Sequence, residues 1–194
     1  IMNFENFNDT IAQKIILNKK LLKLSDSIIF SAKKIFKTIK NGGKIFICGN
    51  GGSAADAQHL SAEFLIRLRP NVNRKPYPVI SLAQDVSTIT ACGNDLGFEK
   101  IFERNLMALG SKKDLLLVIS TSGNSKNIIN VLKYAKKKKI FSLGFLGNKG
   151  GIAKKYTNHS IIVPSTNTAR IQEVHIFLGH FILEQVENLL IKKK

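Results

Sequence analysis

One stretch of the chain, from Gly43 to Phe64, constrains the fold more than any other: GKIFICGNGGSAADAQHLSAEF. Its short apolar run, IFIC, lies between two glycines, which is the pattern of a buried strand. The glycine-rich segment that follows predicts a tight loop, because glycine tolerates positive φ and close backbone approach. We expect Ser53 to be the N-cap of a helix that ends near Phe64, since this segment consists largely of strong helix formers.

A strand that enters a helix through a glycine-rich loop favours anion binding. Free backbone N–H groups and the positive end of the helix dipole meet at such a point. Further along the same predicted helix, His59 and Glu63 are four positions apart and therefore share one face. This pair suits a metal ion or a proton shuttle, although surface helices often carry such a pair by chance.

The rest of the chain alternates strand patterns with helical patterns. Four further strands are expected, at Val79–Leu82, Leu115–Ile119, Ile140–Leu146 and Ser160–Val163. Helices are expected from a cap at Asp85 through Ala91, over Phe98–Leu109, from Ser125 to about Lys138, over Ile152–Tyr156, and from Thr166 to about Ile191. This order predicts one doubly wound α/β domain over residues 1–194, flavodoxin-like, with a mainly parallel five-stranded sheet flanked by helices.

Two long helices are expected ahead of the first strand, over Phe4–Leu24 and from Ser25 or Asp26 to about Lys40. Both have broad apolar faces. Together these faces exceed what a small sheet needs to cover. We therefore expect residues 1–41 to pack on neighbouring subunits as well as on the core.

A second polar loop, Ser120–Ser125, follows five uninterrupted aliphatic residues. Its hydroxyl groups can donate to phosphate oxygens without a cation. Neither this loop nor the first has the lysine of a P-loop or the GxGxxG spacing. Alone, such a loop would be ordinary helix capping. Because ligands of open α/β sheets bind at the carboxyl ends of strands, the two loops together indicate a small phosphorylated metabolite rather than a nucleotide.

The terminal helix adds the candidate ligands Gln172, Glu173, His175 and His180. The two histidines are separated by about 140° around a helix, so we do not expect them to face the same site. Gln172 and His180 differ by about 80° and about 12 Å of rise. They can serve one site only through long reach, a bend near Gly179, or contributions from different subunits.

The formal net charge of +17 is typical of a surface that binds nucleic acid or anionic membrane. The lysines are scattered, however, and lie in no recognisable nucleic-acid-binding motif. We therefore interpret the charge as a solvated surface and expect neither partner. The two cysteines have no setting that requires a disulfide, and no long apolar run or signal peptide is evident. These features predict a cytoplasmic protein.

Four segments resemble the sugar isomerase (SIS) family and, within it, the phosphoheptose isomerase family: CGNGGSAADAQHLSAEF, ACGNDLGFEKIFERNL, ISTSGNSKNII and TARIQEVHIFLGH. The Ser/Thr loop alone indicates only an SIS domain, whereas the QH-x₃-E segment with RIQE and the later histidine is specific to the narrower family. The resemblance implies an enzyme that interconverts sedoheptulose 7-phosphate and D-glycero-D-manno-heptose 7-phosphate through an enediol, supplying heptose for surface glycans.

The resemblance also implies residue roles. The sugar phosphate would be held by Ser120, Thr121, Ser122 and Ser125. The remaining substrate contacts would come from Asn50, Gly51, Gly52, Ser53, Glu63, Asn94, Asp95 and Gln172. One zinc ion per subunit would be bound by His59, Glu63, Gln172 and His180. Glu63 would take the carbon-bound proton and His180 would act as the acid. The family forms homotetramers with active sites at subunit contacts.

Two other functions stay open. One is a non-catalytic SIS protein that binds a replication initiator, and the other is an SIS isomerase for another sugar phosphate, such as an arabinose or hexosamine phosphate. The presence of all four implied zinc ligands favours the enzyme. The two roles of Glu63, zinc ligand and base, conflict, because binding to the metal lowers the basicity of its carboxylate. Either Glu63 leaves the metal during turnover or zinc is chiefly organisational.

Overall fold

The structure, a computed structural model, describes residues 5–191, with side chains from residue 7 onward. Five strands form one sheet in the order β2-β1-β3-β4-β5. Their bounds are β1 Ile45–Gly49, β2 Val79–Ser81, β3 Leu115–Ser120, β4 Phe141–Leu146 and β5 His159–Ile162. Every neighbouring pair is parallel. The predicted five-stranded, doubly wound sheet is confirmed, and its strand order is that of flavodoxin-like folds.

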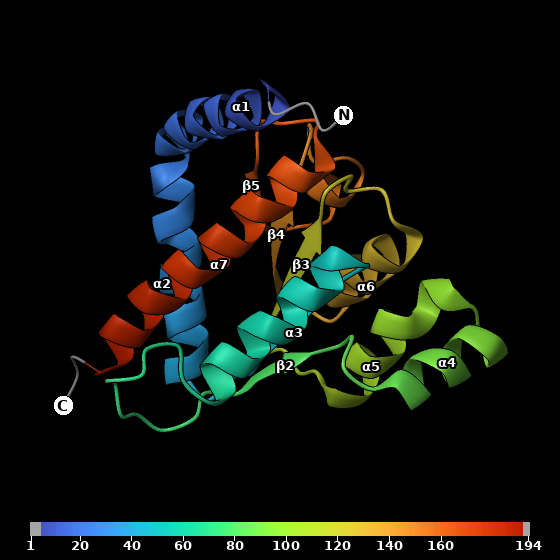
Figure 1. The fold of residues 1–194 in the computed structure, drawn as a ribbon. Coiled ribbons are helices and arrows are strands. Elements are labelled where there is room, and N and C mark those ends of the chain that lie inside the picture. Colours follow the sequence, from blue (N-terminus) through green and yellow to red (C-terminus); the bar gives the residue numbers. More distant parts are fainter. Residues whose placement is uncertain (1–4, 192–194) are drawn as a thin grey trace.

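Helices cover both faces of the sheet (Figure 1). One layer contains α2 (Ser25–Lys40), α3 (Gly52–Leu65) and α7 (Thr168–Ile191). The other contains α4 (Val86–Asp95), α5 (Ile101–Leu109) and α6 (Lys126–Lys137). Three 3₁₀ turns complete the described elements: η1 Leu22–Leu24, η2 Phe98–Lys100 and η3 Ala153–Lys155.

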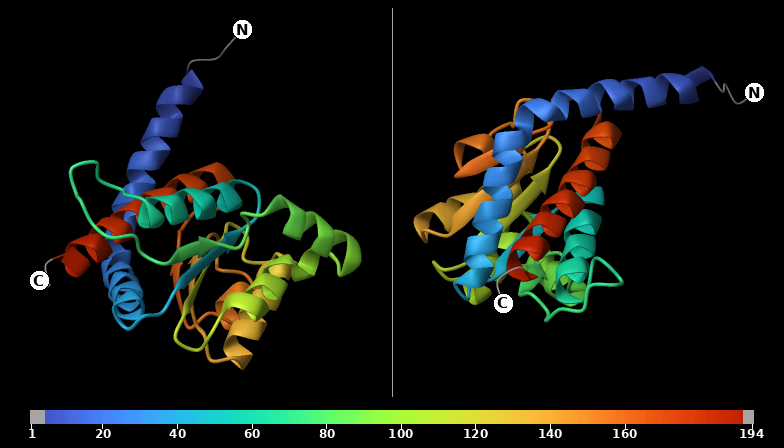
Figure 2. Two further views of the ribbon diagram at one scale, coloured as in Figure 1. Left: turned by 90° about the horizontal axis from the view of Figure 1, so that it is seen from below. Right: turned by 90° about the vertical axis from the view of Figure 1, so that its left-hand side faces the viewer.

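The first helix, α1 (Glu5–Leu21), extends beyond the two layers (Figure 2). Leu17 and Leu21, near its end, are buried against the core. Towards its beginning, Phe7 and Ile15 are more than half exposed. The predicted start of this helix at Phe4 lies outside the described residues.

The central strand β3 shows why the sheet carries helices on both sides. Leu115 and Leu117 pack into the core of the α2–α3–α7 layer, whereas Leu116 and Val118 pack into the core of the other layer. Because side chains alternate across a strand, a run of uninterrupted aliphatic residues can be stable only where both faces are covered.

The prediction that Ser53 caps α3 is wrong. The helix begins at Gly52, and its N-cap is Gly51 at φ +56°, whose carbonyl accepts from Ala54 N and Ala55 N. The positive φ lets the chain turn into the helix two residues earlier than expected, and Ser53 is buried in the first turn. By contrast, the predicted cap at Asp85 is confirmed, since its carboxylate accepts from Ser87 N and Thr88 N.

Helix α7 contradicts the expectation that no segment is long and apolar enough to span a membrane. By length and composition alone it passes that test, with a mean hydropathy of 1.2 over its best window. In this fold it packs along the sheet and buries Ile171, Val174 and Leu178 completely or nearly so. These buried residues belong to the core of the α2–α3–α7 layer. Both cysteines are buried and free, in accord with the sequence analysis.

Candidate active site

The two polar loops predicted to bind phosphate and sugar meet at the centre of the sheet. From β1 the chain crosses to β2 on one side, whereas from β3 it crosses to β4 on the other. The carboxyl ends of these two strands therefore border the crevice in which open α/β sheets bind ligands. An amide pair joins the loops, with Asn50 Nδ2 donating to Asn127 Oδ1 over 2.9 Å and Asn127 Nδ2 donating to Asn50 Oδ1 over 2.8 Å.

The sequence analysis missed Asn127. It lies in the first turn of α6 and is only 2% exposed. A signal was present, because asparagine is a poor helix former and favours helix ends. Its side-chain oxygen also accepts from Ile128 N, so the Asn127 amide links the glycine loop after β1 to the first turn of α6.

The loop Ser120–Ser125 uses some of its hydroxyl groups to hold its own shape. Ser120 Oγ accepts from Gly123 N over 3.0 Å, and Ser122 Oγ accepts from Asn124 N over 3.2 Å. Ser125, the N-cap of α6, makes no capping hydrogen bond through its own side chain. The N-terminus of α6 follows the carboxyl end of β3, where the N–H groups of a helix terminus can bind an anion.

Two helices from distant parts of the chain carry the candidate metal ligands. Helices α3 and α7 lie side by side and run in the same direction (Figures 1 and 2). They approach closely at Gly179, where an added Cβ would lie 2.6 Å from both methyl carbons of Leu60. This contact places the next residue, His180, opposite His59.

His59, Glu63 and His180 come together in one group. His59 Nε2 lies 2.8 Å from His180 Nε2 and 3.6 Å from Glu63 Oε1. One ligand atom from each residue lies within 4.8 Å of the other two. The i, i+4 pair predicted from sequence is therefore joined by the histidine that the sequence could not place.

The donor set and its spacing fit a zinc ion. Two histidines and one carboxylate are a common catalytic zinc set, with a fourth position left open. Around tetrahedral zinc, neighbouring ligand atoms are about 3.3 Å apart. Two of the observed separations, 2.8 and 3.6 Å, lie on either side of this value, and the third, between His180 and Glu63, is no more than 4.8 Å.

Gln172, the fourth implied ligand, lies apart from this group within one chain. Its Nε2 is 2.7 Å from the position that a Cβ on Gly52 would take. Gly52 begins α3 and precedes His59 by seven residues, which corresponds to about 10 Å along the helix. In this arrangement the amide of Gln172 is nearer to the glycine loop than to the histidines.

Asn94 and Asp95 lie exposed at the end of α4. Asn94 Nδ2 donates to Asp95 Oδ1 over 2.8 Å. Within the described part of the chain, no hydrogen bond or ion pair connects either residue to the two crevice loops. The structure of one subunit therefore does not bring this pair together with the rest of the predicted site.

Two further titratable residues, the half-buried Asp56 and the buried His175, do not belong to the group. Burial raises the pKa of Asp56 to about 6 against the opposing effect of His59, and Asp56 Oδ2 has no partner among the described residues. Burial lowers the pKa of His175 to about 4. The nearby Leu146 backbone opposes this shift, but neither ring nitrogen makes a hydrogen bond of good geometry within residues 5–191. His175 faces the core rather than the site, as its helical position predicted.

Comparison with known proteins agrees with this geometry. A family model described as "SIS domain" matches residues 8–146. The phosphoheptose isomerase of Chlorobaculum tepidum is 47% identical over 167 residues, covering 86% of this chain and 80% of that protein. The chain belongs to the phosphoheptose isomerase family of SIS proteins.

Solved structures of the family have the same fold. The phosphoheptose isomerase of Francisella tularensis superposes with a TM-score of 0.92 at 33% identity, covering 97% of this chain and all of that one. The phosphoheptose isomerase of Neisseria gonorrhoeae gives a TM-score of 0.88 at 35% identity, covering 95% and 98%. These coverages show the fold of the family over nearly the whole chain.

Proposed function

We propose that this protein is an aldose–ketose isomerase that converts sedoheptulose 7-phosphate into D-glycero-D-manno-heptose 7-phosphate. The observation that carries this proposal is the convergence of His59, Glu63 and His180. The joined polar loops beside them suit a phosphorylated ligand, and relatives named phosphoheptose isomerase support the seven-carbon sugar. We treat the chain as one SIS domain acting in the cytoplasm, on the route to heptose-containing surface glycans.

The reaction moves a proton between C1 and C2 through an enediol, which requires a base and an acid on one side of the sugar. Glu63 takes the carbon-bound proton; its side chain is 20% exposed and thus accessible to a substrate. His180 exchanges protons with the hydroxyl oxygens. At a separation of 2.8 Å, one of His59 Nε2 and His180 Nε2 donates and the other accepts. The two rings can share this proton only while neither Nε2 is bound to a metal, since a metal-bound ring nitrogen carries no proton.

The loops fix the substrate around these groups. The phosphate binds at the start of α6, held by Ser120, Thr121, Ser122 and Ser125. The sugar hydroxyl groups contact Asn50, Gly51, Gly52, Ser53, Asn94, Asp95 and Gln172. Ser53 contributes through its backbone, because its side chain is buried inside the first turn of α3.

The proposal includes one zinc ion per subunit, held by His59, Glu63 and His180, with Gln172 as the fourth ligand. When bound, the ion polarises a substrate oxygen and fixes its ligands. A carboxylate bound to the ion would be a weak base, so Glu63 would act as the base only when it does not hold the ion. The distance of Gln172 from the histidines within one chain supports a contribution from a neighbouring subunit.

We further propose a homotetramer with active sites at subunit interfaces. In support, the described part of α1 exposes Phe7, Ile15 and Ile16, and α7 exposes Phe177. An apolar groove of about 410 Å³ lies between these helices; the residues that line it are Asn18, Leu21, Leu22, Ser25, Ile28, Ile29, Phe177, Leu178 and Phe181. Covering these surfaces with other copies of the chain would remove a large apolar area from water.

A mass-resolved assay with purified protein and sedoheptulose 7-phosphate tests the proposal. Turnover that is lost with a chelator and restored by zinc would support both the reaction and the metal site. Turnover that is indifferent to the chelator would support the reaction and contradict the metal. Absence of turnover from a folded oligomer would contradict the substrate, in favour of another sugar phosphate or a non-catalytic SIS protein.

A further inference from the structure

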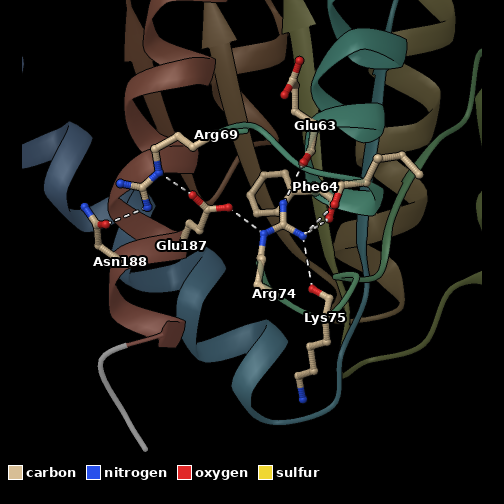
Figure 3. A network of polar contacts seen from close by, with 8 residues as sticks. Glu63, Phe64, Arg69, Arg74, Lys75, Glu187 and Asn188 are labelled. Carbon is tan, nitrogen blue, oxygen red and sulfur yellow. Dashed lines mark hydrogen bonds and ion pairs between the residues drawn. The ribbon is translucent and has the colours of Figure 1, made fainter. Parts of the chain in front are cut away.

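A buried carboxylate outside the candidate site is held by two arginines. Glu187, on α7, is 3% exposed in its side chain. Its Oε1 accepts from Arg74 Nε and its Oε2 accepts from Arg69 Nε, each over 2.6 Å (Figure 3). Arg74 is equally buried at 4%, whereas Arg69 is 34% exposed and also donates to Asn188. We name the group of Arg69, Arg74 and Glu187 the arginine clamp.

The other side of the Arg74 guanidinium binds the end of α3. Its Nη2 donates to the backbone carbonyl of Glu63 over 2.7 Å, and its Nη1 donates to the carbonyl of Phe64 over 2.8 Å. The last carbonyls of a helix have no partner inside the helix, so Arg74 supplies it. Figure 3 shows the Glu63 carboxylate pointing away from Arg74 while the Glu63 carbonyl accepts from it.

The clamp connects the same two helices that carry the candidate site. Glu187 follows His180 by seven positions, about two helical turns, so the two residues lie on nearly the same face of α7. On α3, Arg74 of the clamp donates to the backbone carbonyl of Glu63. One guanidinium therefore bonds to both the residue proposed as base and the helix that supplies the proposed acid.

We propose that Arg74 and Glu187 are positioning residues that set the separation of Glu63 from His180, and with it the affinity of the site for zinc; this rests on the proposed function. His59 Nε2 lies 2.8 Å from His180 Nε2 and 3.6 Å from Glu63 Oε1, close to the spacing of about 3.3 Å around tetrahedral zinc, so a small displacement of α3 along α7 would change the donor geometry. Arginine suits the task, because its planar fork can donate to a carboxylate and to carbonyls at the same time.

Two variants of the full-length protein test this inference: Arg74→Lys and Glu187→Gln. Lysine keeps the charge but cannot bond to the carboxylate and the helix end together, and glutamine presents a neutral amide to two arginine donors. We expect the zinc dissociation constant, measured by competition with a chromophoric chelator, to rise about 10–100-fold, the usual effect of losing outer-shell support. We expect kcat to fall while KM changes little, because the phosphate loop is built on β3 and α6.

Asp114→Asn is the matched control. Asp114 is also buried, at 3%, and accepts from Lys44 N and Ser111 N at the beginning of β3, the opposite end of the sheet from the site. It should lower Tm but leave zinc affinity and kcat as in the wild type. If Tm falls in both clamp variants but their zinc affinity is that of the wild type, the inference is overturned. An equal loss of zinc affinity in Asp114→Asn would overturn it as well.

Arg69→Ala provides a further test in case Arg74→Lys or Glu187→Gln does not fold. Arg69 is partly exposed and bonds only one oxygen of Glu187, so the variant should fold and weaken zinc binding less than Arg74→Lys. Wild-type zinc affinity in this variant would count against the clamp. A zinc titration of the wild type separates the two proposals. If the wild type binds no zinc, the proposed metal site is contradicted. If the wild type binds zinc and the variants bind it equally well, only the inference about the arginine clamp is overturned.

Discussion

His59 Nε2 lies 2.8 Å from His180 Nε2, although the two residues are 121 positions apart in the chain. His59 belongs to a helix that follows the first strand, and His180 to the terminal helix. Their contact turns a common i, i+4 histidine–glutamate pair into a three-residue group with the donor atoms of a zinc site.

Replacing Glu63 by glutamine should abolish most of the isomerase activity. The change keeps the shape of the side chain but removes the proton acceptor, and a positioned general base contributes about 10²–10⁴-fold to a rate. The measurement is kcat for sedoheptulose 7-phosphate, with circular dichroism to confirm folding. A Glu63→Gln protein that turns over at the wild-type rate would exclude Glu63 as the base.

Gly179→Ala should weaken both stability and zinc binding. The new methyl group would meet the Leu60 side chain at 2.6 Å, which forces α3 and α7 apart. Overpacking of this kind costs about 1–3 kcal/mol, measurable by urea unfolding. Adding Leu60→Val should restore part of both losses by making room. Gly93→Ala is the control, because nothing lies within 4 Å of its added Cβ and alanine favours the helix.

Gly52→Ala should lower activity with little effect on stability, whereas Gly123→Ala should lower stability. At Gly52 the added methyl meets the flexible end of Gln172 at 2.7 Å, so the glutamine is displaced and KM or kcat worsens with little change in Tm. At Gly123 it meets the Gly150 carbonyl oxygen at 2.1 Å, and φ is +66°, so the chain itself must distort. We expect a loss of about 2 kcal/mol or more there. Thermal melts and kinetics of both variants distinguish these outcomes; a stable Gly123→Ala protein would contradict the loop geometry.

His175 should make the fold sensitive to acid. Burial lowers its pKa to about 4, so between pH 6.5 and 4 the unfolded state binds more protons than the native state. Stability is therefore complete above pH 6.5 and is lost as the pH falls towards and below 4, by about 3 kcal/mol for this group. Burial raises the pKa of Asp56, which works in the opposite direction between pH 4 and 6 and masks part of the effect.

The contribution of His175 is isolated by comparing urea unfolding of the wild type and His175→Leu across this range. The free energy of unfolding of the variant should fall less on acidification than that of the wild type. If both lose stability in parallel, the buried histidine is not the group responsible. Asp56→Asn provides the converse check, because it should steepen the acid loss by removing the opposing titration.

Local pattern predicted most of the fold. All five strands were located to within a residue or two, because aliphatic runs such as Leu115–Ile119 can be buried only as strands of a covered parallel sheet. The start of α3 was misjudged because the φ of Gly51, rather than the side chain of Ser53, decided where the helix begins. The same glycine loop and the Ser/Thr loop were nevertheless placed correctly at the carboxyl ends of neighbouring strands.

The site was only half visible in the sequence. His59 and Glu63 share a helix face by arithmetic, and Ser120–Ser125 follows from its composition and position. Asn127, Asp56 and Glu187 gave weak signals, because their roles depend on what lies opposite them. Gln172 shows what the sequence could not predict. Helical geometry left open whether it reaches the site by its length, by a bend near Gly179 or from another subunit, and within one chain it lies beside Gly52.

The sequence by itself therefore determined the strands, the helices and the side chains that share a face, because these depend on residues a few positions apart. The tertiary structure alone decided that His180 meets His59, that Asn50 pairs with Asn127, and that Glu187 receives two arginines. Such contacts depend on which helices become neighbours and how closely they pack. That distance is set at places like Gly179, where the absence of a side chain matters only because Leu60 lies opposite.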